Sequence, residues 1–260
     1  MLDAPARPTP PGAASATGRT GRGRYAVRYA VTAEDLDAAQ RLRGLAFAGP
    51  GRPPDKDRFD ALCRHLLVED PRGGALVATC RVRVLSGAAG LDDSYAAQTY
   101  DLAALARFPR PMAEIGRFCI RPGLARDADI LRLTWAALAG LVDAEGIGLL
   151  FGCASFPGTD PAVYRDAFGL LAARHRAPAA WRPGRRAAQT VPLTVAEGWC
   201  AQAALRQMPP LLRSYLGLGG WVGDHAVIDR RMNTLHVFTA VEVAAIPPGR
   251  ARALRALAAS

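Results

Sequence analysis

The sequence predicts a mixed α/β fold built on one sheet, and two observations support this. In the middle of the chain, a strand pattern at 113–120 is followed by an amphipathic helix pattern to Ala144 and a buried strand pattern at 147–156. A strand–helix–strand order makes the two strands parallel. Upstream, the strand patterns 65–69 and 75–85 flank the turn signal Pro-Arg-Gly-Gly, which predicts an antiparallel hairpin. Together they give a single mixed sheet.

The N-terminal elements follow a polar tail. Residues 1–23 are rich in Pro, Gly, Ala, Ser and Thr and include arginines, which predicts a disordered basic tail. Alternating apolar residues predict a strand over 24–32, and the capping-box variant that starts at Thr32 predicts a helix to about Phe47. A loop rich in Gly, Pro and Asp separates this helix from a helical turn within 58–64.

The second half of the chain continues with helices and strands. Asp127 or Asp129 is expected to cap the central helix, Gly146 to end it, and Asp160-Pro161 to begin a helix that reaches about His175. A short helix is expected near 102–107, a loop over 177–188, a helix over 196–207, strands over 225–228 and 234–243, and a basic helix over 248–258. We therefore divide the chain into a tail (1–23), a main domain (24–245) and a C-terminal basic helix (246–260).

The charge and the cysteines narrow the class of protein. The net charge is +10, the pI is near 10.1, and Lys56 is the lone lysine. Such a surface attracts nucleic acid, anionic lipid or an acidic protein. No helix-turn-helix, zinc spacing or aromatic-basic interleaving is present, so we expect no nucleic acid partner. Five scattered cysteines predict neither disulfides nor a metal site. No signal peptide or run of about 20 apolar residues is seen, so we expect a cytoplasmic protein.

The strand at 113–120 carries two charges in an apolar setting. Glu114 and Arg117 stand three residues apart, on opposite faces of a regular strand. If Gly116 marks a bulge, both charges come to one face. Two interpretations stay open: Glu114 is a catalytic base whose pKa is raised by burial, or it is neutralised in an ion pair with Arg81 or Arg117.

Several segments resemble one family, the bacterial L-ornithine N-alpha-acyltransferases of ornithine-lipid synthesis, which belong to the GCN5-related N-acyltransferase superfamily and its hemolysin-like branch. The resemblance covers about residues 25–245. It is carried by Asp-Arg-Phe-Asp at 57–60 with His-Leu-Leu-Val at 65–68, Glu-Ile-Gly-Arg-Phe-Cys at 114–119, Leu-Leu-Phe-Gly-Cys-Ala-Ser-Phe at 149–156 with Gly-Thr-Asp-Pro at 158–161, Pro-Leu-Leu-Arg-Ser-Tyr-Leu at 210–216 and Asn-Thr-Leu-His-Val-Phe at 233–238. It implies a mostly antiparallel sheet with a central parallel strand pair, flanked by helices.

A weaker similarity connects the chain to the acyl-homoserine lactone synthases, which share that fold. The scattered, mostly charged residues typical of that family can be aligned with Arg43, Phe47, Asp57, Asp60, Arg81, Glu114 and Arg117. Their tryptophan between the first helix and the acidic loop is absent here. The stretch 121–129 also lacks the glycine-rich pyrophosphate loop of acetyl-CoA enzymes. This absence favours a donor carried on a protein.

The resemblance implies a reaction and roles for particular residues. A 3-hydroxyacyl group passes from acyl carrier protein to the α-amine of L-ornithine, which gives lyso-ornithine lipid. Glu114 is the candidate base, directly or through water, with Arg117 beside it in the catalytic pair. The candidate oxyanion donors are the backbone amides of Phe118, Cys119 and Ile120. The candidate substrate-binding side chains are Arg43 and Arg81, with Arg117 or Arg213 for the acceptor carboxylate and Asp57, Asp60 or Asp160 for its ammonium.

Cofactors and partners follow from the same resemblance. We expect no resident cofactor and no metal, because 4′-phosphopantetheine arrives on the carrier protein, and the cysteines and histidines are expected to have structural roles. Arginines that include Arg121, Arg126 and Arg132 are expected to dock the acidic carrier. The C-terminal helix could make peripheral contact with the anionic inner membrane through Arg250, Arg252 and Arg255. The alternatives are an acyl-homoserine lactone synthase and a non-catalytic module that binds a carrier protein or lipid headgroup.

Overall fold

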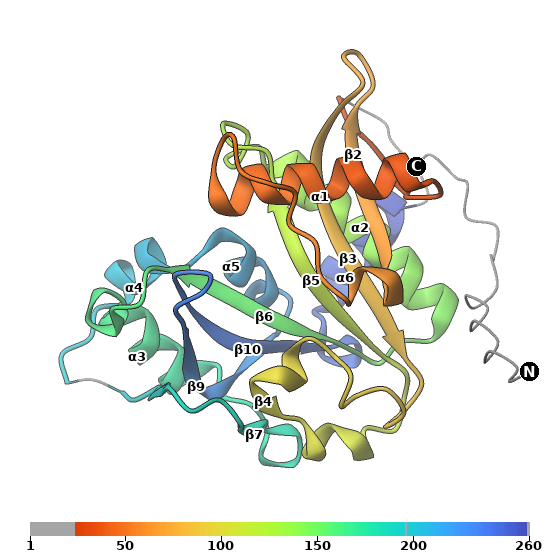
Figure 1. Ribbon diagram of the computed structural model, residues 1–260. Coiled ribbons are helices and arrows are strands. Elements are labelled where there is room, and N and C mark those ends of the chain that lie inside the picture. The colour runs from red at the N-terminus through yellow and green to blue at the C-terminus, as the bar shows by residue number, and fades with distance from the viewer. Residues whose placement is uncertain (1–23, 196, 259–260) are drawn as a thin grey trace, which may run out of the picture.

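The computed structural model describes residues 24–195 and 197–258, so the tail predicted at 1–23 lies outside the described residues. The main element is one mixed sheet in the order β1-β2-β3-β5-β6-β10-β9-β8 (Figure 1). Its strands are β1 (Ala26–Tyr29), β2 (Arg64–Asp70), β3 (Ala75–Leu85), β5 (Met112–Ile120), β6 (Leu149–Pro157), β8 (Thr190–Pro192), β9 (Trp221–Asp229) and β10 (Thr234–Glu242). A small second sheet pairs β4 (Tyr100–Asp101) with β7 (Gly184–Arg185).

Every neighbouring pair in the large sheet is antiparallel except β5 with β6. The predicted hairpin of β2 and β3 and the predicted parallel pair are both confirmed. The α-helices are α1 (Ala33–Ala48), α2 (Ala128–Glu145), α3 (Arg165–Arg174), α4 (Ala201–Gln207), α5 (Pro210–Gly217) and α6 (Pro248–Ala258). The mixed sheet flanked by helices agrees with the predicted fold class.

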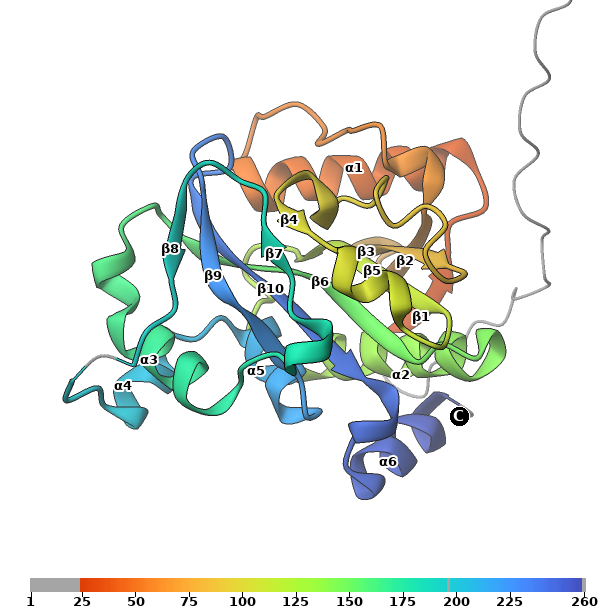
Figure 2. The same ribbon diagram turned by 90° about the horizontal axis from the view of Figure 1, so that it is seen from below.

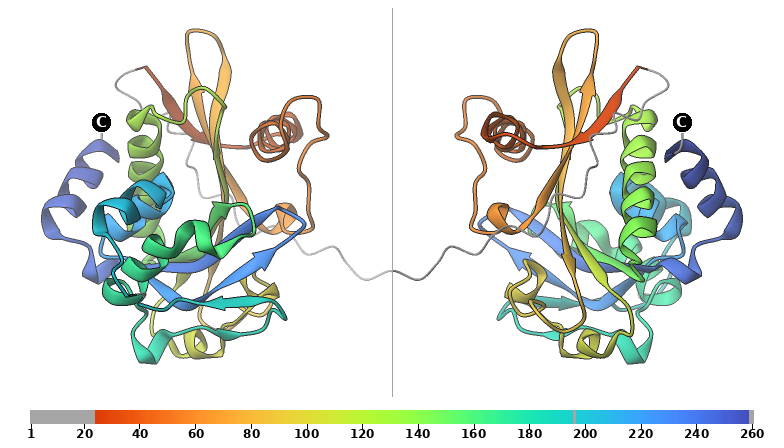
Figure 3. Two further views of the ribbon diagram at one scale, coloured as in Figure 1. Left: turned by 90° about the vertical axis from the view of Figure 1, so that its left-hand side faces the viewer. Right: turned by 90° about the vertical axis from the view of Figure 1, so that its right-hand side faces the viewer.

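The helices cover the two faces of the sheet unequally. The views from below and from the side place α1 on one face and α2, α5 and α6 on the other (Figure 2, Figure 3). On the second face, Ile130 and Leu138 of α2 pack against Ile115 of β5 in the largest apolar cluster. On the face of α1, Tyr100 of the small sheet packs against Phe151 and Phe238. The sheet is therefore buried on both sides, and charged groups inside it need internal partners.

Local sequence signals explain the helix ends. The Thr32 hydroxyl accepts from the Asp35 amide at 3.2 Å, and the Asp35 carboxylate accepts from the Thr32 amide at 3.3 Å. This is the predicted capping box. The Asp127 carboxylate caps α2, and Gly146 ends it in the left-handed conformation with φ 62°, as the sequence predicts. α6 packs Leu254 and Leu257 against the core, and Arg255 binds Asp143 at 2.7 Å.

Several expected boundaries differ from the structure. The helix expected over 196–207 is α4 and begins at Ala201. The helix predicted to begin at Asp160-Pro161 is a 3-10 turn (Pro161–Tyr164) followed by α3, because Tyr164 leaves helical geometry at φ −111°, ψ 20°. The loop predicted over 177–188 contains β7, and its two residues are too few for a detectable alternation. The strand predicted at 225–228 begins earlier, at Trp221, because a glycine at 223 interrupts its apolar pattern.

Candidate active site

The parallel strands β5 and β6 separate halfway along their length. They pair over four positions, from Met112 with Leu149 to Ile115 with Gly152. Beyond that point β5 pairs with β3 alone and β6 with β10 alone. A cavity of about 1140 Å³ occupies the gap and is lined by both strands, by α5 and by the turn between β9 and β10. The two parallel strands therefore open into a cavity.

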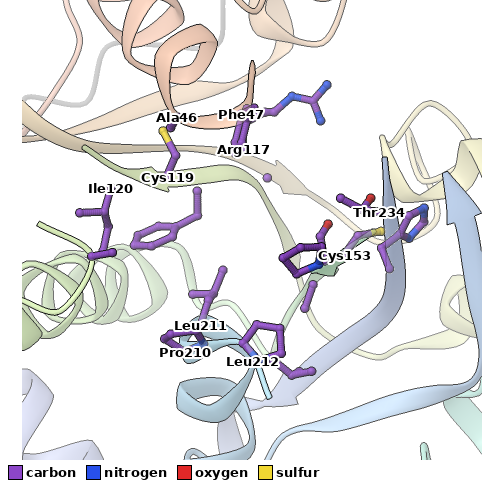
Figure 4. Close-up of a pocket in the computed structure, with 18 of the residues that line it drawn as sticks. Ala46, Phe47, Arg117, Cys119, Ile120, Cys153, Pro210, Leu211, Leu212 and Thr234 are labelled. Carbon is purple, nitrogen blue, oxygen red and sulfur yellow. The ribbon is translucent and has the colours of Figure 1, made fainter. Parts of the chain in front are cut away.

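The cavity has walls of different character. Ile120 and Leu211 lie on one side, and Cys153 and Thr234 lie on the opposite side (Figure 4). Arg117 and Phe47 lie above them in the same view, toward α1. An apolar wall can hold an acyl chain, and a wall with polar groups can orient a polar substrate. The cavity is therefore suited to an amphipathic pair of substrates.

A bulge in β5 directs Glu114 and Arg117 into the same cavity. Thr79 pairs with Cys119 and Arg81 with Gly116, so the register shifts by one residue. Arg117 has a φ of 51°, the left-handed conformation, which is uncommon for a residue with a side chain. Both Glu114 and Arg117 line the cavity. The bulge considered from Gly116 is therefore present.

Glu114 is held by backbone amides. Its two carboxylate oxygens accept hydrogen bonds from the Tyr95 amide at 2.9 Å and the Ala96 amide at 2.7 Å. Among the residues that the structure describes, Glu114 forms no ion pair with Arg81 or Arg117. Burial raises the pKa of Glu114, although the two amides and the nearby charges of Arg81 and Arg83 oppose that shift. A fixed carboxylate with a raised pKa suits a general base.

Arginines and aspartates form a closed ring of ion pairs beside Glu114. Each guanidinium bonds two carboxylates, each carboxylate bonds two guanidiniums, and the donor–acceptor distances run from 2.5 to 3.2 Å. Three positive and three negative charges leave no net charge. We call this cluster the arginine–aspartate ring; its members in order are Arg43, Asp60, Arg81, Asp57, Arg117 and Asp55.

The ring is buried at Arg43, Asp60 and Arg81 and partly exposed at its other three members. Arg43 and Arg81 are 1% and 2% exposed. Burial acts to raise the pKa of Asp60, but hydrogen bonds and charges from Arg43 and Arg81 outweigh it and lower the pKa to about 2. The pKa of Asp57 is also lowered, because Arg81 and Arg117 outweigh its burial. Buried charges of this kind are tolerated only when they are mutually compensated.

Tyr95 connects the ring to Glu114. Its amide donates to Glu114, and its ring centroid lies 4.7 Å from the guanidinium carbon of Arg117 and 5.4 Å from that of Arg81. Such contacts between an aromatic ring and a cation are attractive. The arginine–aspartate ring therefore positions the loop that holds Glu114.

This arrangement changes the interpretation of several predicted substrate-binding residues. Asp57, Asp60, Arg43 and Arg81 bind one another and are not among the residues that line the cavity. Asp160 caps the 3-10 turn through the Ala162 amide at 2.9 Å and lies outside the cavity lining. Arg117 lines the cavity but donates to two aspartates.

Arg213 is exposed and lines the cavity. It forms no ion pair with any carboxylate in 24–195 or 197–258, so it is the guanidinium of the predicted set that is available to a substrate carboxylate.

The three predicted oxyanion donors differ in the direction of their backbone amides. Phe118, Cys119 and Ile120 all line the cavity. The Arg121 amide donates to the Val77 carbonyl at 2.7 Å, so Cys119, two residues earlier, also directs its backbone toward β3, and Ile120 directs its amide away from β3. Phe118, on the other side of Cys119, likewise directs its amide away from β3. Because β6 has already separated, the amides of Phe118 and Ile120 both face the gap.

The cysteines have the properties of packing residues. Burial raises the pKa of Cys119 to about 12 and raises that of Cys153 still further. Both are therefore thiols rather than thiolates near neutral pH, and the thiolate is the nucleophilic form. This agrees with the expected structural role.

Sequence reasoning missed three residues of the site. Asp55 completes the arginine–aspartate ring, and its position two residues before Asp57 in an acidic loop was the available signal. Tyr95 acts through its backbone amide, which no residue type reveals. His236 lines the cavity although the sequence favoured a core or surface role; its neighbours come from distant segments.

The arginines proposed for carrier docking differ in availability. Arg126 is exposed and lines the cavity. Arg121 donates twice to the Leu76 carbonyl, at 3.0 and 2.8 Å. Arg132 binds Asp129 at 3.0 Å. Arg126 is therefore the best placed of the three at the mouth of the cavity.

Comparisons with known proteins agree with this geometry. Residues 39–136 match the acetyltransferase (GNAT) domain family. The chain is 36% identical over 237 residues to an L-ornithine N(alpha)-acyltransferase of Rhodobacter capsulatus, covering 85% of this chain and 91% of that protein. It is 34% identical to one of Brucella abortus, covering 83% of each chain.

A solved structure supports the fold. FeeM, an N-acyl amino acid synthase from uncultured soil microbes, superimposes with a TM-score of 0.51 at 15% identity, covering 85% of this chain and 93% of that one. The identities to the sequence relatives, sustained over most of both chains, confirm the resemblance first seen in the motifs. The chain belongs to the L-ornithine N(alpha)-acyltransferase family.

Proposed function

We propose that this protein transfers a 3-hydroxyacyl group from acyl carrier protein to the α-amino group of L-ornithine and so forms lyso-ornithine lipid. The observation that carries the proposal is the cavity between the separated strands, which joins an apolar wall to Glu114 in a chain of this family. The acceptor follows from the names of the relatives, which extend over most of the chain.

The donor is proposed to lie in the gap between β5 and β6. Ile120, Leu131 and Leu211 offer an apolar path for the acyl chain and its pantetheine arm. The stretch 121–129 lacks the glycine-rich loop that grips a pyrophosphate. A carrier-bound thioester needs no such grip, and an acidic carrier would meet Arg126 at the mouth of the cavity.

The chemistry needs no covalent enzyme intermediate. The neutral α-amine attacks the thioester carbonyl, a C–N bond forms, and the nitrogen proton passes to Glu114 directly or through one water. A backbone amide that faces the gap, that of Phe118 or Ile120, stabilises the oxyanion. The C–S bond then breaks, and the pantetheine sulfur leaves as a thiolate that takes up the proton. Arg213 is proposed to hold the α-carboxylate of the acceptor as a bidentate fork.

The test is an assay of purified protein with 3-hydroxyacyl carrier protein and L-ornithine. Free thiol should appear together with N-acylornithine, identified by mass spectrometry. A folded protein that releases no thiol would contradict the proposal and favour a non-catalytic binding module. Consumption of S-adenosylmethionine with release of a lactone would instead identify an acyl-homoserine lactone synthase.

The site of action is part of the same proposal. Within 24–195 and 197–258, no helix has the length and apolar character needed to cross a bilayer. We propose a protein of the cytoplasm that touches the inner membrane peripherally through Arg250 and Arg252 of α6, because its product is a lipid. Replacing both arginines by glutamate should reduce sedimentation with anionic vesicles; unchanged sedimentation would dismiss this contact.

A further inference from the structure

We infer that Asp229 and His236 form a subsite for the side-chain ammonium of the acceptor, and this inference rests on the proposed function. The residues predicted for that ammonium are unsuited to it: Asp57 and Asp60 belong to the arginine–aspartate ring, and Asp160 lies outside the cavity lining. A second amine on the acceptor needs another anionic partner, because a buried ammonium without one is strongly disfavoured.

Among the described residues, three carboxylates line the cavity, and they differ in their partners. Glu114 uses both oxygens to accept backbone amides. Asp127 accepts from the Tyr25 hydroxyl with one oxygen and from the Asp129 amide with the other. Asp229 accepts one bond, from the Met232 amide at 3.0 Å to Oδ1. Among the described residues, Asp229 forms no ion pair, and its Oδ2 has no hydrogen-bond donor.

Asp229 lies on the same face of the sheet as Glu114. Glu114 pairs with Phe151 of β6, and alternate residues along β6 lead from Phe151 through Cys153 to Pro157 on one face. Pro157 pairs with Thr234 and Thr234 with Asp229. Figure 4 shows Cys153 and Thr234 together on one wall of the cavity. The two carboxylates thus lie toward opposite ends of one polar wall.

Cys153 lies between these carboxylates. Burial is the main cause of its raised pKa, and the charges of Glu114 and Asp229 add to that shift while the charge of Arg117 opposes it. The two nitrogens of ornithine are separated by five bonds, roughly 6 Å when extended. An ornithine extended along this wall would direct its α-amine toward Glu114 and its side-chain ammonium toward Asp229, both of which line the cavity.

His236 adds a neutral acceptor beside Asp229. It is 5% exposed and lines the cavity, and burial lowers its pKa to about 4, so it carries no charge that would repel an ammonium. The Tyr100 hydroxyl donates to the His236 carbonyl at 2.8 Å and lies 3.4 Å from Nδ1. Since the hydroxyl proton is used, Nδ1 is assigned as the donor, which leaves the Nε2 lone pair as an acceptor.

The test compares L-ornithine with L-norvaline, which has the same carbon chain without the second amine. The wild-type protein should use ornithine far more efficiently than norvaline. Asp229→Asn keeps an oxygen for the Met232 amide but removes the charge. It should lower kcat/KM for ornithine about 10–100-fold, mainly through KM, and leave norvaline within about twofold. His236→Phe should shift the same ratio in the same direction.

The controls separate this inference from the proposed function. Asp160→Asn removes an exposed carboxylate outside the cavity lining and should leave the ornithine to norvaline ratio unchanged. If wild-type protein acylates neither amino acid, the proposed function fails. If wild type prefers ornithine and Asp229→Asn retains the full preference, the function stands and the subsite is refuted. A wild type that does not distinguish the two amino acids also refutes the subsite.

Discussion

A Cβ atom on Gly152 would lie 2.3 Å from the carbonyl oxygen of Ile115. This pair is the last at which β5 and β6 are joined, so the absence of a side chain sets the closest approach of the two strands just before the cavity opens.

Gly152→Ala should therefore push β6 away from β5. We expect a loss of about 1–3 kcal/mol in the free energy of unfolding and a fall in acyl transfer, because the donor gap changes shape. Denaturant unfolding and the thiol-release assay measure the two effects. Gly140→Ala is the control: residue 140 lies in α2 with open space around it, and there alanine should stabilise the helix by about 0.5–1 kcal/mol.

Glu114→Gln should lower kcat about 10²–10⁴-fold if Glu114 takes the proton of the amine. The amide oxygen can still accept one of the two backbone N–H bonds, so the protein should remain folded. Circular dichroism checks the fold and single-turnover acylation measures the rate. Turnover at the parent rate would remove Glu114 from the mechanism and leave it a role in loop positioning.

The pH dependence of the same reaction gives a separate prediction. Burial raises the pKa of Glu114 above its ordinary value of 4.5, and the base must be deprotonated to act. Activity should therefore fall as pH drops through this raised pKa, in a range where an exposed glutamate would still be ionised. This fall in activity at low pH should be absent from the residual activity of Glu114→Gln. A wild-type profile that stays flat down to pH 4.5 would contradict the assignment.

Removal of Arg81 should be severe. Arg81→Met leaves Asp57 and Asp60 without a shared cation in a buried site, and breaking such a cluster costs about 3–5 kcal/mol. Arg64→Met, which removes a surface partner of Glu145, should change the free energy of unfolding by less than about 1 kcal/mol. Equal effects of the two substitutions would show that the ring is not a stabilising unit.

Carrier recognition should depend on salt. Arg126 is exposed at the cavity, so Arg126→Glu should raise KM for acyl carrier protein and flatten its dependence on ionic strength. With a short acyl-pantetheine donor, which has no acidic surface, Arg126→Glu should be as active as the wild-type protein. If wild-type turnover with acyl carrier protein is insensitive to salt, the docking surface lies elsewhere.

The elements that sequence predicts well depend on neighbouring residues. The Thr32 capping box, the Asp127 cap and the Gly146 terminator each involve groups within a few positions, and all are present in the structure. The parallel pair followed from the helix between its strands. Each of these features reflects local backbone geometry that a residue type reports directly.

The site was predicted less completely, because its contacts join distant segments. Arg117 meets Asp55 across 62 positions, and Glu114 is held by the amide of Tyr95 across 19. The sequence marked most of the charged residues of the site but could not tell which would bind one another and which would face a substrate. In the sequence, Asp57 and Arg213 are both simply candidate substrate-binding charges. Only the fold shows that Asp57 binds neighbouring arginines and that Arg213 lines the cavity.

The arginine–aspartate ring also bears on how the chain acquires its structure. It joins α1, the loop before β2, and the strands β3 and β5, which are spread from Arg43 to Arg117. Without Arg117, the earlier members hold three negative charges against two positive ones, so an N-terminal fragment cannot bury them in balance. Folding of this half should therefore be all-or-none, with α1 amides exchanging hydrogen only when β5 is also released.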